Sequence, residues 1–96
     1  MNNEIEELLN EQLDNNLTEE ILESFYKAIK DVLGDINSRY SSIQAFELGY
    51  MSFLFTRLVK KAEKREVTPE ERDEFFNWFK KNAVRKIEER ADIYGI

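Results

Sequence analysis

The chain of 96 residues is long enough for one hydrophobic core and too short for two, and its apolar fraction of 42% is sufficient to fill that core. With three glycines and one proline it has few signals for tight turns, so an all-α fold is expected. The absence of cysteine and histidine excludes disulfides, thiolate metal sites and histidine-based acid–base catalysis, and the net charge of −6 disfavours direct nucleic-acid binding.

The charge is unevenly distributed along the chain. Residues 1–48 carry three basic and eleven acidic side chains, a balance of −8, whereas residues 49–96 carry eleven basic and nine acidic ones, a balance of +2. The first residues do not show a basic segment followed by an apolar one, so we expect no signal peptide. The most apolar run, residues 48–59, is shorter than the roughly twenty residues that span a bilayer, so we expect a soluble, cytoplasmic protein.

The first two expected helices cover about residues 3–14 and 19–33. The first has a narrow apolar stripe, formed by Ile5, Leu8, Leu9 and Leu13. The second is preceded by Thr18, a residue type that accepts hydrogen bonds at the N-cap, and is followed by Gly34, which suits the position after a helix C-terminus.

The third expected helix is apolar or small on nearly all sides in its first half. At about 100° per residue, its predicted core face comprises Leu48, Met51, Phe55, Leu58, Val59 and Ala62. A second arc is aromatic and then basic, and comprises Ile43, Phe46, Tyr50, Phe53, Arg57, Lys60, Lys61 and Lys64. A third stripe is small, and comprises Ala45, Gly49, Ser52 and Thr56. We interpret the segment as a central helix with residues 43–56 as its most buried stretch; a membrane-interface helix and a partner-binding groove are the alternatives.

Capping residues mark the boundaries of the last two helices. The third begins between residues 36 and 43 and ends near residue 65, and its candidate N-caps are Asp35, Asn37, Ser38 and Ser42. The fourth covers about residues 69–91, because Thr68, Pro69 and Glu71 form a capping-box pattern at its start. The chain is therefore predicted to be one domain, residues 1–96, folded as an antiparallel four-helix bundle with a central hydrophobic third helix.

Glu47 lies among apolar neighbours on the third helix. If it is buried it needs a partner, which Arg39 or a basic residue of the fourth helix could supply; alternatively, its side chain reaches solvent at a helix seam. The paired acidic residues elsewhere lie in first turns or on polar faces, where they stabilise the helix dipole. Without histidine or a glycine-rich phosphate loop, we expect no catalytic site, no cofactor and no metal.

Trp78 lies off the predicted core arc of the fourth helix, among charged residues. Because tryptophan is enriched at binding hot spots, we predict that it contacts a protein partner; packing at the edge of the core is the alternative. The other predicted contact residues are Arg85, Tyr94 and Ile96 on the C-terminal helix and tail, and Arg57, Lys61 and Lys64 on the third helix. For the basic residues of the third helix, the alternative is a solvated face or pairing with the acidic first half.

The segments "ILESFYKAI", "GYMSFLF" and "KREVTPEERDEFFNWF" and the tail "RADIYGI" give the chain a layout that resembles the class IIa bacteriocin immunity proteins of the enterocin A type. The resemblance covers roughly residues 20–96 and implies a small cytosolic antiparallel four-helix bundle. It also implies that the C-terminal helix and residues 91–96 help to select the bacteriocin, and that the protein acts at the periphery of a membrane complex, a sugar phosphotransferase permease. The acidic balance of this chain departs from the basic character common in that family.

A second hypothesis is an acidic helical inhibitor or adaptor, of the kind that phages and mobile elements encode, that binds a host protein. Its acidic first half would then mimic nucleic acid or complement a basic patch on that protein. Both hypotheses predict a protein partner and no catalysis, and neither predicts an oligomeric state.

Overall fold

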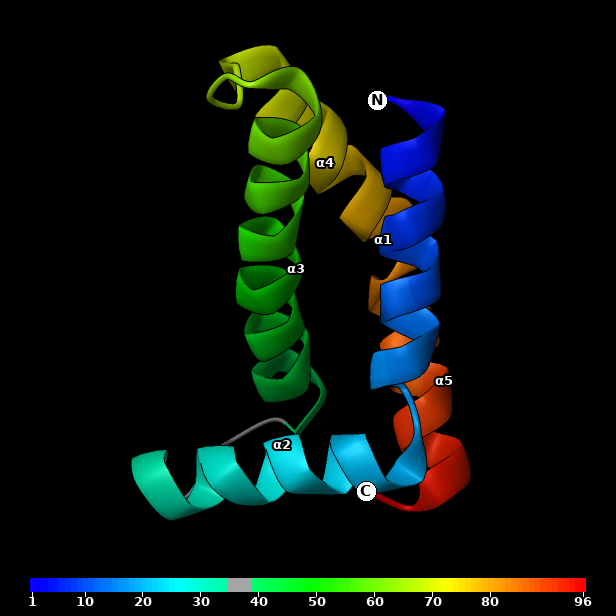
Figure 1. Ribbon diagram of the computed structural model, residues 1–96. Coiled ribbons are helices and arrows are strands. Elements are labelled where there is room, and N and C mark those ends of the chain that lie inside the picture. Colours follow the sequence, from blue (N-terminus) through cyan, green and yellow to red (C-terminus); the bar gives the residue numbers. More distant parts are fainter. Residues whose placement is uncertain (35–38) are drawn as a thin grey trace.

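The computed structural model describes residues 1–34 and 39–96, without the side chain of Arg39. This part of the chain contains helices and no strand, which confirms the all-α class (Figure 1). The helices are α1 (Asn3–Asn16), α2 (Glu19–Leu33), α3 (Arg39–Glu63), α4 (Pro69–Asn82) and α5 (Val84–Tyr94). The predicted caps Asp35, Asn37 and Ser38 lie outside the described residues, and Ser42 lies inside α3, so it does not cap this helix.

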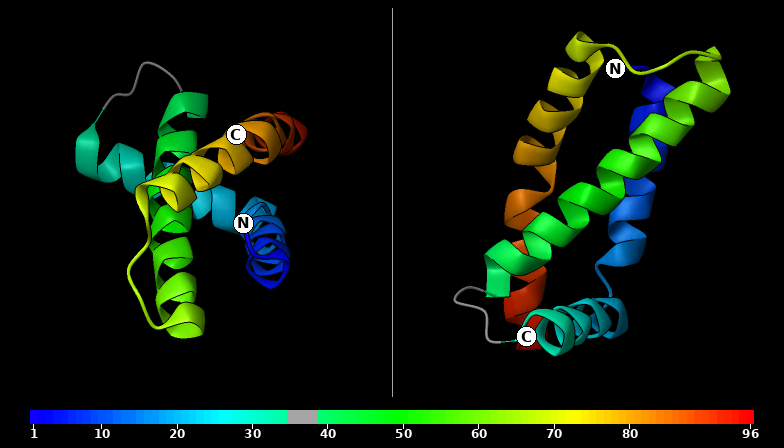
Figure 2. Two further views of the ribbon diagram at one scale, coloured as in Figure 1. Left: turned by 90° about the horizontal axis from the view of Figure 1, so that it is seen from above. Right: turned by 90° about the vertical axis from the view of Figure 1, so that its left-hand side faces the viewer.

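α3 is the central helix, since each of the other four packs against it. α1 and the consecutive helices α4 and α5 run in the direction opposite to α3, whereas α2 lies across one end of the molecule (Figures 1 and 2). This crossing position differs from the predicted antiparallel four-helix bundle, in which α2 would lie alongside α3. As a consequence, one long side of α3 is left without a helix over it.

Local hydrogen bonds account for both ends of α2, which has the predicted bounds. The Thr18 side chain accepts a hydrogen bond from the backbone N–H of Ile21 at 3.4 Å, as an N-cap does. Gly34 follows the helix with φ of 79°, a conformation that glycine adopts without steric cost, and its N–H donates to the Lys30 carbonyl at 2.8 Å.

The start of α4 is a complete capping box, as predicted. The Glu71 backbone N–H donates to Thr68 Oγ1 at 3.2 Å, and the Thr68 backbone N–H donates to Glu71 Oε1 at 3.0 Å. Arg65 also binds Glu71 through both carboxylate oxygens, at 2.5 and 3.0 Å. These bonds, that of Arg65 first, lower the pKa of Glu71 to about 2.

The predicted fourth helix is interrupted at Ala83, which separates α4 from α5. The prediction of a single helix over about residues 69–91 was therefore wrong. Ala83 is fully buried, and the side chain of Asn82 donates to the Trp78 carbonyl at 2.9 Å, a local bond that competes with helical pairing. The chain changes direction here (Figure 2), and α5 continues along a line on which it packs against both α3 and α2.

The buried side chains of α3 follow a single stripe with a spacing of four residues: Ile43, Glu47, Met51, Phe55 and Val59. Of the predicted core face, Leu48 and Leu58 are half-buried and Ala62 is exposed. The prediction that residues 43–56 form the most buried stretch was wrong, because Phe46, Tyr50 and Phe53 are exposed.

We expect Phe55→Ala to lower the free energy of unfolding by about 3–5 kcal/mol, because this ring is buried and would leave a cavity. It stacks on Phe75 with ring centroids 5.2 Å apart. Phe53→Ala is the matched control: it makes the same change on the exposed side of α3, and should cost less than about 1 kcal/mol. Urea titration of both variants measures the difference, and equal losses would contradict the assigned core face.

We expect Thr68→Ala to destabilise the protein by about 1 kcal/mol, because it removes the acceptor at the start of α4. Thr56→Ala serves as the control, since the Thr56 hydroxyl donates to the Ser52 carbonyl within α3 and caps no helix. Thermal unfolding should shift for Thr68→Ala and stay near the wild-type midpoint for Thr56→Ala. An unchanged midpoint for Thr68→Ala would show that the capping box contributes little to stability.

Candidate functional site

Trp78, predicted to lie at an exposed partner surface, is 6% exposed. Its indole Nε1 donates to Asn10 Oδ1 of α1 at 3.2 Å, and its ring stacks on Phe75 at a centroid distance of 5.8 Å. The prediction of an exposed ring was therefore wrong, and packing at the edge of the core describes this residue better. The reason is tertiary: the side of α4 that looks polar in isolation faces α1.

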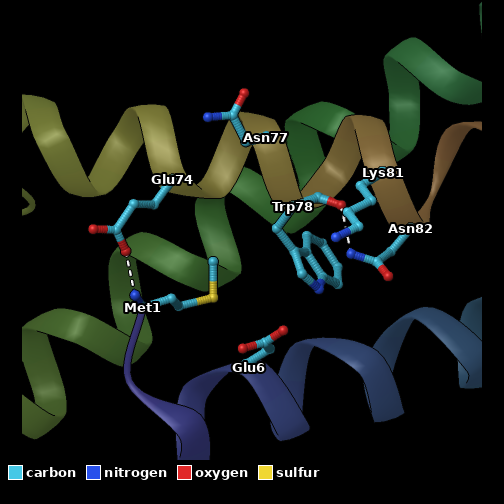
Figure 3. A pocket seen from close by; sticks show the side chains of 7 residues that line it. All are labelled: Met1, Glu6, Glu74, Asn77, Trp78, Lys81 and Asn82. Atoms are coloured by element: carbon cyan, nitrogen blue, oxygen red, sulfur yellow. Dashed lines mark hydrogen bonds and ion pairs between the residues drawn. The ribbon is translucent and has the colours of Figure 1, made fainter.

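One edge of Trp78 borders an open hollow of about 400 Å³ between α1 and α4 (Figure 3). Its other lining residues are polar, charged or terminal: Met1, Glu6, Glu74, Asn77, Lys81 and Asn82. The amino group of Met1 is paired with the Glu74 carboxylate across this hollow. Acidic and basic groups thus line it together, so its charge selects neither a cation nor an anion.

The C-terminal tail, which was predicted to contact a partner through Tyr94 and Ile96, is packed against the protein. Ile96 is 8% exposed, and its backbone N–H donates to the Ala91 carbonyl at 2.9 Å. Gly95, with φ of 71°, allows the reversal that brings Ile96 back to the core. Tyr94 is half-buried against the same core. Ile96 is therefore part of the core and is not available as an exposed contact residue.

The predicted basic contact residues are exposed but do not form one site. Arg57, Lys61 and Lys64 lie toward the C-terminal end of α3, whereas Arg85 lies on α5, away from that end of the molecule (Figure 1). Arg85 is 4.0 Å from Glu89, one turn further along its own helix. The Arg57 guanidinium lies over the ring of Phe53, 5.7 Å from its centroid, which joins the basic part of the second arc to its aromatic part.

Three aromatic side chains on α3 are the largest apolar feature that the fold leaves uncovered on this helix. Phe46, Tyr50 and Phe53, here called the α3 aromatic face, are 40%, 41% and 62% exposed. The ring of Phe46 packs against the ring of Phe25 of α2, with the ring centroids 4.4 Å apart. The predicted contact residues did not include these three, although the sequence carried a signal for them in the arc that turns from aromatic to basic.

Two apolar hollows meet α3 at Ala45, one on the side of α2 and one on the side of α4. The hollow toward α2 has a volume of about 470 Å³ and is lined by Ile29, Leu33, Ser41, Ser42, Ala45 and Phe46. The hollow toward α4 has a volume of about 320 Å³ and is lined by Gln44, Ala45, Leu48, Phe76, Phe79, Lys80 and Val84. Ala45 lines both, so the apolar surface continues from α2 across α3 to α4.

Glu47 is fully buried, and its partner is a neutral amide. Its Oε2 accepts a hydrogen bond from Asn16 Nδ2 of α1 at 3.3 Å, whereas Oε1 has no hydrogen-bond partner among the described residues. One predicted partner, Arg39, has its side chain outside the described residues, and among the described residues Glu47 bonds to Asn16 and not to a basic residue of the fourth helix. The alternative of a side chain reaching solvent was also wrong. Burial raises the pKa of Glu47 to about 7, while the bond from Asn16 opposes that shift.

The described residues contain no group of three or more acidic side chains placed to hold a metal ion. The carboxyl of Glu47 is sealed from solvent by its neighbours, so a substrate cannot reach it without opening the core. Its chemistry in the folded protein is therefore confined to gaining and losing a proton.

Comparison of the chain with protein-family models, curated proteins and solved structures found no match. The resemblance to the bacteriocin immunity proteins therefore stays a prediction from residue patterns. Within the described ranges, none of the helices combines the length and the apolar character that a membrane span requires.

The raised pKa of Glu47 makes folding stability depend on pH. The folded protein holds this proton more tightly than the unfolded chain, whose carboxyl has the ordinary pKa of 4.5. The resulting stability is complete below about pH 4.5 and is lost as the pH rises toward 7, by about 1.4 kcal/mol per pH unit. Glu47→Gln removes the titration, so relative to wild type the variant should gain about 3 kcal/mol between pH 5 and pH 8.

Urea titrations of wild type and Glu47→Gln at several pH values measure this difference. Contributions from the other carboxylates, including Glu71, are common to both proteins and cancel when one free energy of unfolding is subtracted from the other. A difference that stays constant from pH 5 to pH 8 would mean that Glu47 does not titrate in that range in the folded state.

Proposed function

We propose that the chain is a non-catalytic protein-binding module that acts in the cytoplasm and binds its partner through the α3 aromatic face. The observation that carries this proposal is the exposure of Phe46, Tyr50 and Phe53 together on the central helix. Aromatic residues are enriched in protein interfaces, and a contiguous exposed apolar patch on a small protein is typical of a contact surface. In this proposal the fold is a helical bundle with four members, namely α1, α2, α3 and the α4–α5 pair, and α2 closes one end of the bundle.

The composition supports binding over catalysis. The chain has no histidine and no cysteine, which removes the most common general base and the most reactive nucleophile. Among the described residues, the one carboxyl with a strongly raised pKa, that of Glu47, is enclosed in the core.

The immunity-protein hypothesis assigns recognition to the C-terminal helix and tail. The burial of Trp78 and Ile96 removes two of the side chains that this surface required, and leaves Arg85 exposed and Tyr94 half-buried. The α3 aromatic face therefore supports a binding role better than the tail does. The inhibitor or adaptor hypothesis needs only a protein partner, and a contact through α3 is compatible with it.

Affinity capture from extracts of the native cells tests the proposal. We expect the wild-type chain to capture a specific protein, identified by mass spectrometry, and the double variant Tyr50→Ala/Phe53→Ala to lose it. Ile93→Ala is the matched control, because Ile93 is 73% exposed on α5, outside the α3 aromatic face. Circular dichroism checks that all three proteins stay folded. Equal capture by wild type and the double variant would contradict a binding role for this face.

A further inference from the structure

The contact between Asn16 and Glu47 joins two enclosed side chains at the end of α1. Asn16 is the last residue of α1, is 5% exposed and donates to Glu47 at 3.3 Å. Its own Oδ1 accepts a hydrogen bond from Gln12 Nε2, one turn earlier, at 3.3 Å, and this bond orients the amide so that its NH₂ group points to the carboxyl. The contact therefore lies directly before the buried Leu17 and the corner into α2.

This contact suits a neutral carboxyl better than a charged one. A carboxylate has two oxygens that accept hydrogen bonds, and burial of a charge without adequate partners is costly. Here Oε2 of Glu47 has one neutral donor, and Oε1 has no partner among the described residues. Loss of the proton leaves a buried charge that the closed contact does not compensate, and this charge regains water when the helices around it separate.

The titratable and charged groups that α1, α2, α4 and α5 bring to the first half of α3 do not compensate this charge. They are Asp14 of α1, Glu19, Glu20 and Tyr26 of α2, Tyr40 of α3 itself, Lys80 of α4, and Lys86, Glu88, Arg90, Asp92 and Tyr94 of α5. Some are paired with each other across helices, as Asp14 is with Lys86. None of these groups contributes to the shift in the pKa of Glu47, which burial raises and the bond from Asn16 opposes.

The proton on Glu47 therefore stabilises the closed contact over a defined pH range. The pKa of Glu47 is about 7 in the folded protein, against 4.5 for a solvated carboxyl. Because the closed state holds the proton more tightly than an open state does, the opening equilibrium is independent of pH below about 4.5. It then shifts toward opening by about tenfold per pH unit up to pH 7, and levels off above that pH.

α1 is the helix that can separate from α3 most easily. Its main helix contact among the described residues is with α3, whereas α5 packs against α2, α3 and α4. Near its C-terminal end, α1 is also linked to α5 by the solvent-exposed ion pair of Asp14 and Lys86, a kind of pair that contributes little to stability. The bond from Trp78 to Asn10 holds the earlier turns. A helix of 14 residues is marginal in isolation, so its last turns can unwind once they are detached.

We propose that loss of the proton from Glu47 releases the last turns of α1, residues 11–16, and the corner at Leu17 from α3, while α4 and α5 stay packed against α3. The fold thus contains a pH-dependent switch at the contact between α1 and α3. Release uncovers Leu13 and Leu17, each of which is 1% exposed in the closed state. This inference does not rest on the binding function proposed above, because it concerns a motion of α1 and not a partner.

Amide hydrogen exchange of the full chain, followed by NMR between pH 5.5 and pH 8 and at several low urea concentrations, tests the switch. Each rate is divided by that of an unstructured chain at the same pH, so that the protection of an amide reports its opening equilibrium. We expect protection at residues 11–17 to fall about tenfold per pH unit up to pH 7 and then to level off. It should also be at least about tenfold lower than in α4 and depend little on urea, because a local opening exposes little surface.

Two variants assign the pH dependence to one group. Glu47→Gln keeps the shape of the side chain and cannot titrate, so protection at residues 11–17 should stay within about twofold from pH 5.5 to pH 8. Glu11→Gln is the matched control: it makes the same change on the exposed side of α1 and should keep the wild-type profile. The comparison of α1 with α4 within the wild-type chain needs no variant, so it stands even if Glu47→Gln does not fold.

Three outcomes would overturn the inference. Protection at residues 11–17 that does not change with pH would show that α1 stays closed when the proton leaves. Exchange there with the same protection and the same urea dependence as in α4 would mean that the proton leaves only on global unfolding. A pH dependence that persists in Glu47→Gln would assign it to another group. The binding function proposed for the α3 aromatic face is independent of these results, because Tyr50 and Phe53 are exposed in the closed state.

Discussion

The buried stripe of α3, from Ile43 through Met51 to Val59, is the surface on which the rest of the protein is assembled. α1 and the α4–α5 pair lie along α3 and α2 crosses its end, so each of the other helices depends on this one element for burial. The stripe is one side chain wide at each turn. Although α3 is apolar on most sides, one of these sides is therefore buried in the core and another is exposed to solvent.

Glu47 is part of this stripe and is its only charged member. It meets Asn16, the last residue of α1, so the contact lies close to the corner at which the chain turns from α1 into α2. Because the carboxyl is buried and one of its oxygens has no hydrogen-bond partner among the described residues, the protonated form is favoured up to nearly neutral pH, although the bond from Asn16 opposes this effect. The contact between α1 and α3 at this position is therefore linked to whether the Glu47 carboxyl is protonated.

The same packing decides which surfaces remain for function. α1 covers Trp78 and the core takes up Ile96, so the C-terminal part of the protein is more structural than its sequence indicates. α2 crosses the end of α3 (Figure 1), and Phe46, Tyr50 and Phe53 of α3 and Phe76 of α4 stay exposed. The uncovered aromatic side chains and the basic residues that border them are the features for which folding of the monomer provides no explanation.

The sequence by itself determined the helical class, both ends of α2 and the start of α4, because these depend on groups only a few residues apart. Thr18, Gly34 and the box formed by Thr68 and Glu71 act through hydrogen bonds or backbone preferences within one turn, and such patterns can be read without knowledge of the fold. Nothing in the local pattern marked the break at Ala83, since the junction contains no proline or glycine. Only the tertiary structure decided that break, the exposure of the aromatic side of α3, the burial of Trp78 and the partner of Glu47. Each depends on which helix lies opposite, and a helix that is apolar on nearly every side does not specify its neighbours through its own periodicity.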